Sequence, residues 1–252
     1  MSLPIWTPAA LSFEARTASG AWWRLVEAQH QVSTMKLVDS VGEQSLLEAL
    51  LEETKPAFPP ECAGLDYLLA TPFRYGAYPR GSRFRRAGRT PGVYYAAEEV
   101  TTALAEMAFY RLLFYSESPS TPLPANAAEY TAFSAQIATD RAIDLTLPPL
   151  VKDEPVWTDP VDYAACQTLA DAARAGDIEA ILYRSVRDPK GGRNIALLTA
   201  KGFAAREPTD RQTWRIRLSS SGVQALCEFP RRLVGFATAD FSGDERLRAR
   251  FG

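Results

Sequence analysis

Hydrophobic positions recur at helical spacing in three stretches of the chain. Leucines at 46, 47, 50 and 51 within residues 43–54 predict an amphipathic packing helix, which the prolines that follow would end. A short apolar run at 93–96 predicts a strand, and it leads into a helical pattern over residues 98–115. The alanine-rich residues 163–175 predict a further helix with Gly176 as its C-cap.

The second half of the chain is dominated by short β-type runs. They lie at residues 131–138, 180–186, 194–199, 213–218 and 223–229. Because strands and helices do not alternate regularly, we predict an α+β fold: a single domain with a mixed or antiparallel sheet core and flanking helices. Residues 1–60 are expected to form a helical or irregular leader packed on the core, continuous with a main body of residues 61–252.

Composition narrows the class of protein. A hydrophobic fraction of 46%, a charged fraction of 23% and a net charge of −2 indicate a globular chain, and they exclude nucleic-acid binding driven by overall positive charge. No apolar stretch is long enough to span a membrane, and three scattered cysteines favour a reducing cytoplasm. A single histidine, His30, removes most histidine-based catalysis and metal binding, so we expect no metal.

Positive charge is concentrated in residues 67–97. This stretch contains six arginines and no Asp, Glu or Lys. Arginine outnumbers lysine 23 to 5 in the whole chain, so one interpretation is a solvated basic loop. The other is an anion site, because guanidinium groups bind phosphate oxygens and the interleaved tyrosines offer faces for a planar base. Phosphate together with a planar ring describes a nucleotide or single-stranded nucleic acid.

Two other polar residues stand in notable places. Glu106 lies on the apolar helical stretch, so it is either a solvated face residue or a partly buried carboxylate that needs a cation or hydrogen bonds. The arginine-rich segment could supply that cation. Ser185 ends a β-run before a glycine-containing turn, where it either faces a pocket mouth or makes ordinary strand-end hydrogen bonds. No G-x-S-x-G sequence supports a serine hydrolase.

Arginine, glutamate and serine in these contexts resemble the RES-domain family, which is named for its three polar residues. The resemblance is carried by the segments Pro72–Tyr75, Gly81–Arg85, Gly92–Ala96, Thr102–Glu106 and Tyr183–Ser185, with Asn194 following, and a leader-like segment at 22–28 extends it. It implies a fold similar to ADP-ribosyltransferase toxins, with NAD as substrate. Many relatives carry Gly-Gly-Arg-Trp where this chain has Gly-Ser-Arg-Phe at 81–84.

Residue roles follow from the same resemblance. It implies catalytic roles for Glu106, Ser185 and Arg74. It also implies an NAD-binding group, namely Arg83, Tyr75, Tyr95 and Asn194, with residues 61–252 as the catalytic domain. The chemistry agrees with these residues without reference to the family. Cleavage of the nicotinamide–ribose bond passes through an oxocarbenium-like state, which a carboxylate can stabilise without any histidine.

The resemblance further implies a toxin of a type II toxin–antitoxin system. Its expected activity is mono-ADP-ribosylation of a cellular protein, and the alternative is an NAD glycohydrolase or phosphorylase that depletes NAD. A remote alternative is a single-stranded nucleic-acid binding module. The implied partner is an antitoxin with an Xre- or ParS-type helical domain, which would form a hetero-oligomer with the toxin and cover the NAD pocket.

Overall fold

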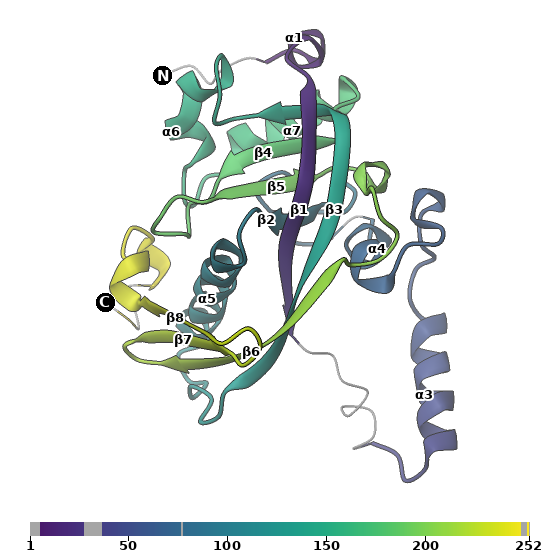
Figure 1. Cartoon of the computed structure of the whole chain (residues 1–252), viewed down its shortest axis with the longest axis vertical. Coiled ribbons are helices and arrows are strands. Elements are labelled where there is room, and N and C mark those ends of the chain that lie inside the picture. The colour runs from purple at the N-terminus through teal and green to yellow at the C-terminus, as the bar shows by residue number, and fades with distance from the viewer. Residues whose placement is uncertain (1–5, 28–36, 77, 248–250, 252) are drawn as a thin grey trace.

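The computed structural model describes residues 6–27, 37–76, 78–247 and 251. One curved sheet runs through the whole molecule, with helices on both of its faces (Figure 1). The strands are β1 (Arg16–Glu27), β2 (Tyr94–Ala97), β3 (Ala128–Asp144), β4 (Ala180–Arg184), β5 (Arg193–Leu197), β6 (Asp210–Ser219), β7 (Gly222–Cys227) and β8 (Arg232–Ala237). The main helices are α1 (Pro8–Phe13), α3 (Val41–Glu53), α4 (Tyr67–Arg74), α5 (Val100–Glu117), α6 (Glu154–Trp157) and α7 (Ala164–Ala175).

Strand β3 organises the sheet, because its two halves have different neighbours. Its first half pairs antiparallel with β6, and residues 142–144 near its end pair parallel with β4. Strand β1 runs antiparallel along the other edge of β3 and also meets β2. Since β2 pairs with β5 and β5 with β4, five strands close a ring, from which β6, β7 and β8 extend as a flap.

Three apolar clusters fill the space around this sheet. Helix α5 packs on β1 and on the β6–β8 flap, with Phe109 and Trp214 fully buried there. A second cluster around Tyr94 and Phe133 joins the strands of the ring to helix α4 through Leu69 and Phe73. Helices α1 and α7 cover β4 and β5 around the buried Leu11 and Trp157. Helix α5 therefore lies between the ring and the flap, and its buried face is fixed from both sides (Figure 1).

The α+β fold with a mixed sheet is confirmed, and β3–β4 is the parallel pair among the described strands. Helices α5 and α7 and strands β2 to β7 all lie where the hydrophobic pattern predicts them. Strands β1 and β8 were not predicted. In β1, exposed, half-buried and buried positions follow no simple alternation, and β8 has no buried position.

The predicted helix at 43–54 exists as α3, but its packing role was wrong. None of its residues is buried, and Leu46, Leu50 and Leu51 are 61%, 51% and 46% exposed. The leucine spacing dictates a helix, yet no part of the described chain covers the leucine face.

Candidate functional site

The structure brings together three of the predicted site residues: Ser185 and Asn194 both bind one carboxylate oxygen of Glu106. Glu106, in the second turn of α5, accepts hydrogen bonds at Oε1 from Ser185 Oγ and Asn194 Nδ2, each at 2.7 Å. Ser185 directly follows β4, and Asn194 lies in β5 opposite Tyr183. The antiparallel pairing of β4 and β5 therefore brings the serine and the asparagine together beneath the helix.

Both partners of Glu106 are neutral, so of the two alternatives for this carboxylate the structure has hydrogen bonds and not an arginine of the 67–97 stretch. Among the described residues no cation lies within ion-pair distance of this carboxylate, and no hydrogen bond reaches its Oε2 atom. The hydroxyl and amide fix the orientation of the carboxylate without neutralising its charge. In addition, Asn194 Oδ1 is buried with no hydrogen-bond partner in the described structure, and a ligand donor could use it.

The loop after Ser185 is tied to the start of α5. Ser185 Oγ accepts hydrogen bonds from the backbone N–H groups of Arg187 (3.2 Å) and Asp188 (3.0 Å). Asp188 in turn accepts one from Thr102 Oγ1 at 2.8 Å, in the first turn of the helix. A Cβ on Gly192 would collide with that threonine hydroxyl, so this close approach requires glycine. Together with the bond to Glu106, these contacts use the donor and both acceptor positions of the Ser185 hydroxyl.

Two tyrosines, the buried Tyr183 and the half-exposed Tyr110, lie near the Glu106 carboxylate. Burial raises the pKa of Tyr183 well above its ordinary value, and the negative charge of Glu106 raises it further. The pKa of Tyr110 is also raised, first by burial of its hydroxyl and then by Glu106. Tyr95 Oη lies 2.8 Å from Ser82 Oγ and accepts a hydrogen bond from the Phe84 N–H at 3.1 Å. The raised pKa values of Tyr110 and Tyr183 keep both hydroxyls protonated at physiological pH.

Arg83, predicted to bind NAD, is buried and lies near Tyr110 and Tyr183, the two tyrosines that Glu106 also affects. Its guanidinium donates to the carbonyl oxygens of Trp157 (2.6 Å) and Asp159 (2.9 Å) and stacks on the ring of Tyr163 at 4.6 Å. Its charge is close enough to lower the pKa of Tyr110 and of Tyr183, against the effect of burial. Arg83 therefore supplies positive potential near Glu106 while it orders the 157–159 segment.

Arg74 and Tyr75 are not brought to this group. Arg74 is 6% exposed, pairs with Glu52 at 2.5 Å, donates to the carbonyl of Pro56 and stacks on Phe58 at 4.3 Å. Tyr75 caps α4 and packs edge-to-face against Tyr78. In the structure Arg74 binds Glu52 near the C-terminal end of α3. Its predicted catalytic role stays a prediction.

Other arginines of the 67–97 stretch also have partners within the protein. Arg86 pairs with Asp171 at 2.6 Å and donates to Thr168. Arg85 stacks on Tyr78 and donates to the carbonyl of Arg80. Much of the positive charge in this stretch therefore fixes loop geometry, which neither initial interpretation anticipated.

A cavity of about 510 Å³ opens beside Ser185. This volume lies in the range of small-molecule sites. Ser185 and Phe109 line it, whereas Glu106 and Asn194 are not among the lining residues. Four carboxylates (Glu154, Asp188, Asp240 and Asp244) and two arginines (Arg184 and Arg187) also line it. The acids outnumber the bases, and both arginines are already paired with lining carboxylates, Arg184 with Glu154 and Arg187 with Asp244.

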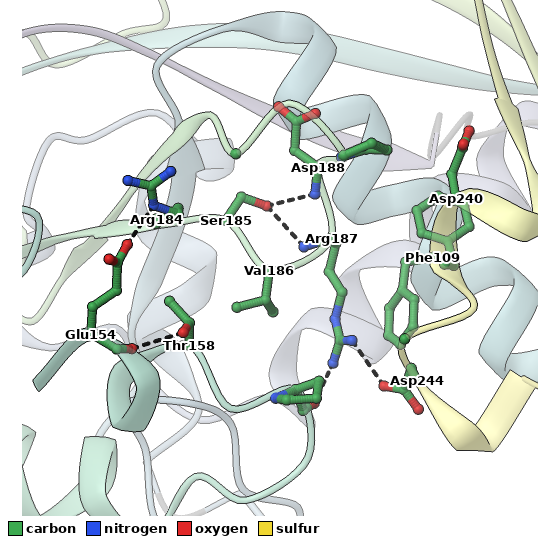
Figure 2. A pocket seen from close by; sticks show the side chains of 15 residues that line it. Phe109, Glu154, Thr158, Arg184, Ser185, Val186, Arg187, Asp188, Asp240 and Asp244 are labelled. Carbon is green, nitrogen blue, oxygen red and sulfur yellow. Dashed lines mark hydrogen bonds and ion pairs between the residues drawn. The ribbon is translucent and has the colours of Figure 1, made fainter.

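One wall of this cavity is a buried ion pair that sequence reasoning missed. Arg187 Nη1 lies 2.8 Å from Asp244 Oδ2, and its guanidinium stacks on Phe109 at 3.7 Å (Figure 2). Arg246 binds the same carboxylate at 2.7 Å. Arg187 follows Ser185 by two residues and could have been found from that position, but nothing in the sequence connects Asp244 to it across 57 residues.

Two other expectations concern metals and membranes. In the described ranges no group of three or more His, Cys, Asp or Glu side chains could hold a metal ion, and His30 lies outside those ranges. No helix in the described part of the chain is both long and apolar enough to cross a membrane.

Comparisons with known proteins place the chain in a family. A search of curated proteins gives no match. Among solved structures, the crystal structure of the M. tuberculosis MbcT–MbcA toxin–antitoxin complex contains a similar chain: 15% identity, 92% of this chain and 95% of that chain covered, and a TM-score of 0.43. The family model of the RES domain matches residues 59–219, well over half of the 252 residues. The chain therefore belongs to the RES domain family.

Proposed function

We propose that this protein is a toxin that binds NAD, cleaves the nicotinamide–ribose bond and transfers ADP-ribose to a cellular protein. Membership of the RES domain family supports the use of NAD. The observation that carries the proposal is the Glu106 carboxylate, which Ser185 and Asn194 hold in place without a cation. An anion fixed in this way can stabilise developing positive charge without reorganising.

Bond cleavage follows from this geometry. The bond between ribose C1′ and the pyridinium nitrogen breaks, and its electron pair returns to the ring, so nicotinamide leaves neutral and needs no acid. Positive charge then develops on the ribose, against which Glu106 Oε2 would lie. An acceptor nucleophile forms the new bond at C1′ and releases its proton to Glu106 or to solvent.

The neighbouring residues have supporting roles in this proposal. Ser185 and Asn194 position the carboxylate, and Asn194 Oδ1 is free to accept a hydrogen bond from the ribose or the carboxamide. Arg83 supplies positive potential for the pyrophosphate, and Tyr95 holds the 82–84 loop that carries it. Arg74 and Tyr75 would contribute only through the α4 segment.

Water or phosphate as acceptor gives the alternative, an NAD glycohydrolase or phosphorylase. The excess of carboxylates around the adjoining cavity disfavours a phosphate acceptor there, because like charges repel. The same excess suits a basic or neutral protein side chain. We also propose that a cognate antitoxin, with the Xre- or ParS-type helical domain that the resemblance implies, forms a hetero-oligomer with this toxin in the cytoplasm.

A direct test incubates the purified protein with NAD labelled on its adenylate half, with and without a cell lysate. Nicotinamide release together with label on a discrete protein band supports transfer. Free ADP-ribose alone assigns hydrolysis, and ADP-ribose 1″-phosphate in phosphate buffer assigns phosphorolysis. Unchanged NAD in all three conditions would refute NAD as substrate, and salt-sensitive RNA binding would then favour the nucleic-acid module.

A further inference from the structure

The segment 238–247 reaches the candidate site, although it lies beyond residues 59–219, the range that the RES domain model matches. Phe241 and Leu247 are buried in the apolar cluster around α5 and anchor the segment there. Asp244 lies between them and is 2% exposed. The fold therefore holds the Asp244 carboxylate at a fixed place beside the loop that follows β4.

An unbroken chain of contacts joins Asp244 to Glu106. Asp244 Oδ2 accepts a hydrogen bond from Arg187 Nη1 at 2.8 Å, and both side chains are buried. The backbone N–H of Arg187 donates to Ser185 Oγ at 3.2 Å, and Ser185 donates to Glu106 Oε1 at 2.7 Å. Figure 2 shows Arg187 between the Ser185 hydroxyl and Asp244. The position of the Glu106 carboxylate therefore depends on where Asp244 holds the guanidinium.

A second route to Glu106 passes through helix α5. The guanidinium of Arg187 stacks on the ring of Phe109 at 3.7 Å, and Phe241 meets the same ring edge-on with centroids 6.0 Å apart. Phe109 follows Glu106 by three residues, so the two side chains are neighbours on the helix surface. Contacts on two sides of the Phe109 ring restrain the turn of α5 that carries Glu106.

Four hydrogen bonds hold the Asp244 carboxylate in one orientation. Arg246 donates to Oδ1 from its N–H (3.1 Å) and Nε (2.9 Å) and to Oδ2 from Nη2 (2.7 Å), beside the bond from Arg187. Arg187 also donates to the Pro160 carbonyl at 2.5 Å. Without the charge of Asp244, Arg187 would be a buried cation with neutral partners, which is unfavourable. The guanidinium would then shift and take the Ser185 loop with it.

We propose that Asp244 and Arg187 are positioning residues for Glu106, and that the segment 238–247 is therefore a working part of the NAD site. The inference rests on the proposed NAD cleavage and adds to it a stretch of chain beyond residues 59–219. A reacting group displaced by about 1 Å can lose a large factor in rate. Since the two residues act through Ser185 and Phe109, loosening them should lower turnover and leave the binding of NAD nearly unchanged.

The test measures nicotinamide release by the full-length protein carrying Asp244→Asn, Ser185→Ala or both, well below the unfolding temperature of each variant. We expect turnover of Asp244→Asn to fall about tenfold, with the KM for NAD within about twofold of the wild type. Because both substitutions loosen the same chain of contacts, the double variant should also be about tenfold slower than the wild type. Independent effects would multiply to about 100-fold.

Control variants separate positioning from general loss of stability. Leu11→Ala opens a cavity beneath α1, away from this chain of contacts, and should keep wild-type turnover in the same assay. Arg246→Gln is a milder second variant, because its side chain is 32% exposed, and should slow turnover about threefold. Arg215→Gln breaks an exposed pair with Glu228 on the flap and should leave turnover unchanged.

Hydrogen exchange of a peptide covering 183–192 gives a readout that needs no NAD. The amides of this loop should exchange about tenfold faster in Asp244→Asn than in the wild type, and less so in Leu11→Ala. The inference is overturned if Asp244→Asn keeps wild-type turnover, if the double variant is about 100-fold slower, or if the exchange is unchanged. A wild-type protein that leaves NAD intact would refute the proposed function, and the exchange result would then decide whether Asp244 holds the loop.

Discussion

Two glutamates, Glu106 on α5 and Glu52 on α3, illustrate opposite uses of a carboxylate. Each accepts hydrogen bonds from two side chains. The partners of Glu106 are a hydroxyl and an amide, whereas those of Glu52 are Lys55 and Arg74. The two cations lower the pKa of Glu52, Lys55 more than Arg74, and they neutralise its charge. No described cation pairs with Glu106, and this difference favours Glu106 as the group that acts on a substrate.

Helices α5 and α3, which carry these two glutamates, also differ in how much of their surface is covered. Helix α5 is clamped between the ring of strands and the flap, and the buried Arg187–Asp244 pair stacks against its Phe109. Helix α3 is fixed at its ends and bare along its leucine face. Precise placement of a reacting group requires a rigid support. We therefore expect substitutions near α5 to affect catalysis and substitutions on the exposed face of α3 to leave it unchanged.

The largest expected effect is that of Glu106→Gln on NAD cleavage. The amide oxygen can still accept hydrogen bonds from Ser185 and Asn194, so the fold should persist while the charge is lost. We expect the rate of nicotinamide release to fall by about 100-fold or more. Glu52→Gln is the matched control and should leave the rate unchanged. Equal rates for wild type and Glu106→Gln would remove Glu106 from the mechanism.

Breaking the buried pair with Asp244→Asn should lower the free energy of unfolding by about 3 kcal/mol at neutral pH, because Arg187 would be left buried with a weaker partner. Burial alone would raise the pKa of Asp244, but hydrogen bonds from Arg246 and the charges of Arg187 and Arg246 hold it below 3.8. Folding therefore favours the ionised form.

The pH dependence of that variant has a definite sign. The stabilisation is fully present above the pKa of the unfolded state and is lost as pH falls through the lower folded value. Denaturant titrations should show wild type and Asp244→Asn furthest apart at pH 7 and converging below about pH 4. A constant difference across this range would show that the aspartate charge is not what stabilises the fold.

Ser185→Ala should have an intermediate effect. It removes one donor to Glu106 and leaves two backbone N–H groups of the following loop without an acceptor. We expect turnover to fall about tenfold with little change in the KM for NAD, since the group positions the carboxylate and does not bind substrate. Thr102→Val, which loosens the same loop at Asp188, is a useful second variant. A complete loss of activity in Ser185→Ala alone would indicate a direct chemical role.

Arg74→Met should have the smallest effect on catalysis. Loss of the contact with Phe58 should lower stability by about 1 to 2 kcal/mol, while NAD affinity stays near that of the wild type. Arg83→Met should, by contrast, weaken NAD binding. Calorimetric titration of both variants measures this directly. A folded Arg74→Met protein that no longer binds NAD would restore Arg74 to the binding site.

Local sequence patterns predicted most of the strands, the helices α5 and α7 and several site residues. The periods of the hydrophobic pattern located α5, α7 and most strands, because a helix or strand buried on one face must repeat at its own period. The motif positions likewise singled out Glu106, Ser185 and Asn194. Strand β1 escaped notice because it lies between β2 and β3, where burial depends on strands more than 60 residues away.

The sequence by itself determined the elements, the fold class and the polar residues that converge on Glu106. Only the tertiary structure decided that the partners of Glu106 are neutral, that Arg74 holds α3, and that Asp244 reaches Arg187. An arginine has the same side chain wherever it stands, and its role depends on which acceptor the fold places within about 3 Å of it. Such pairings join distant segments, so local patterns carry no information about them.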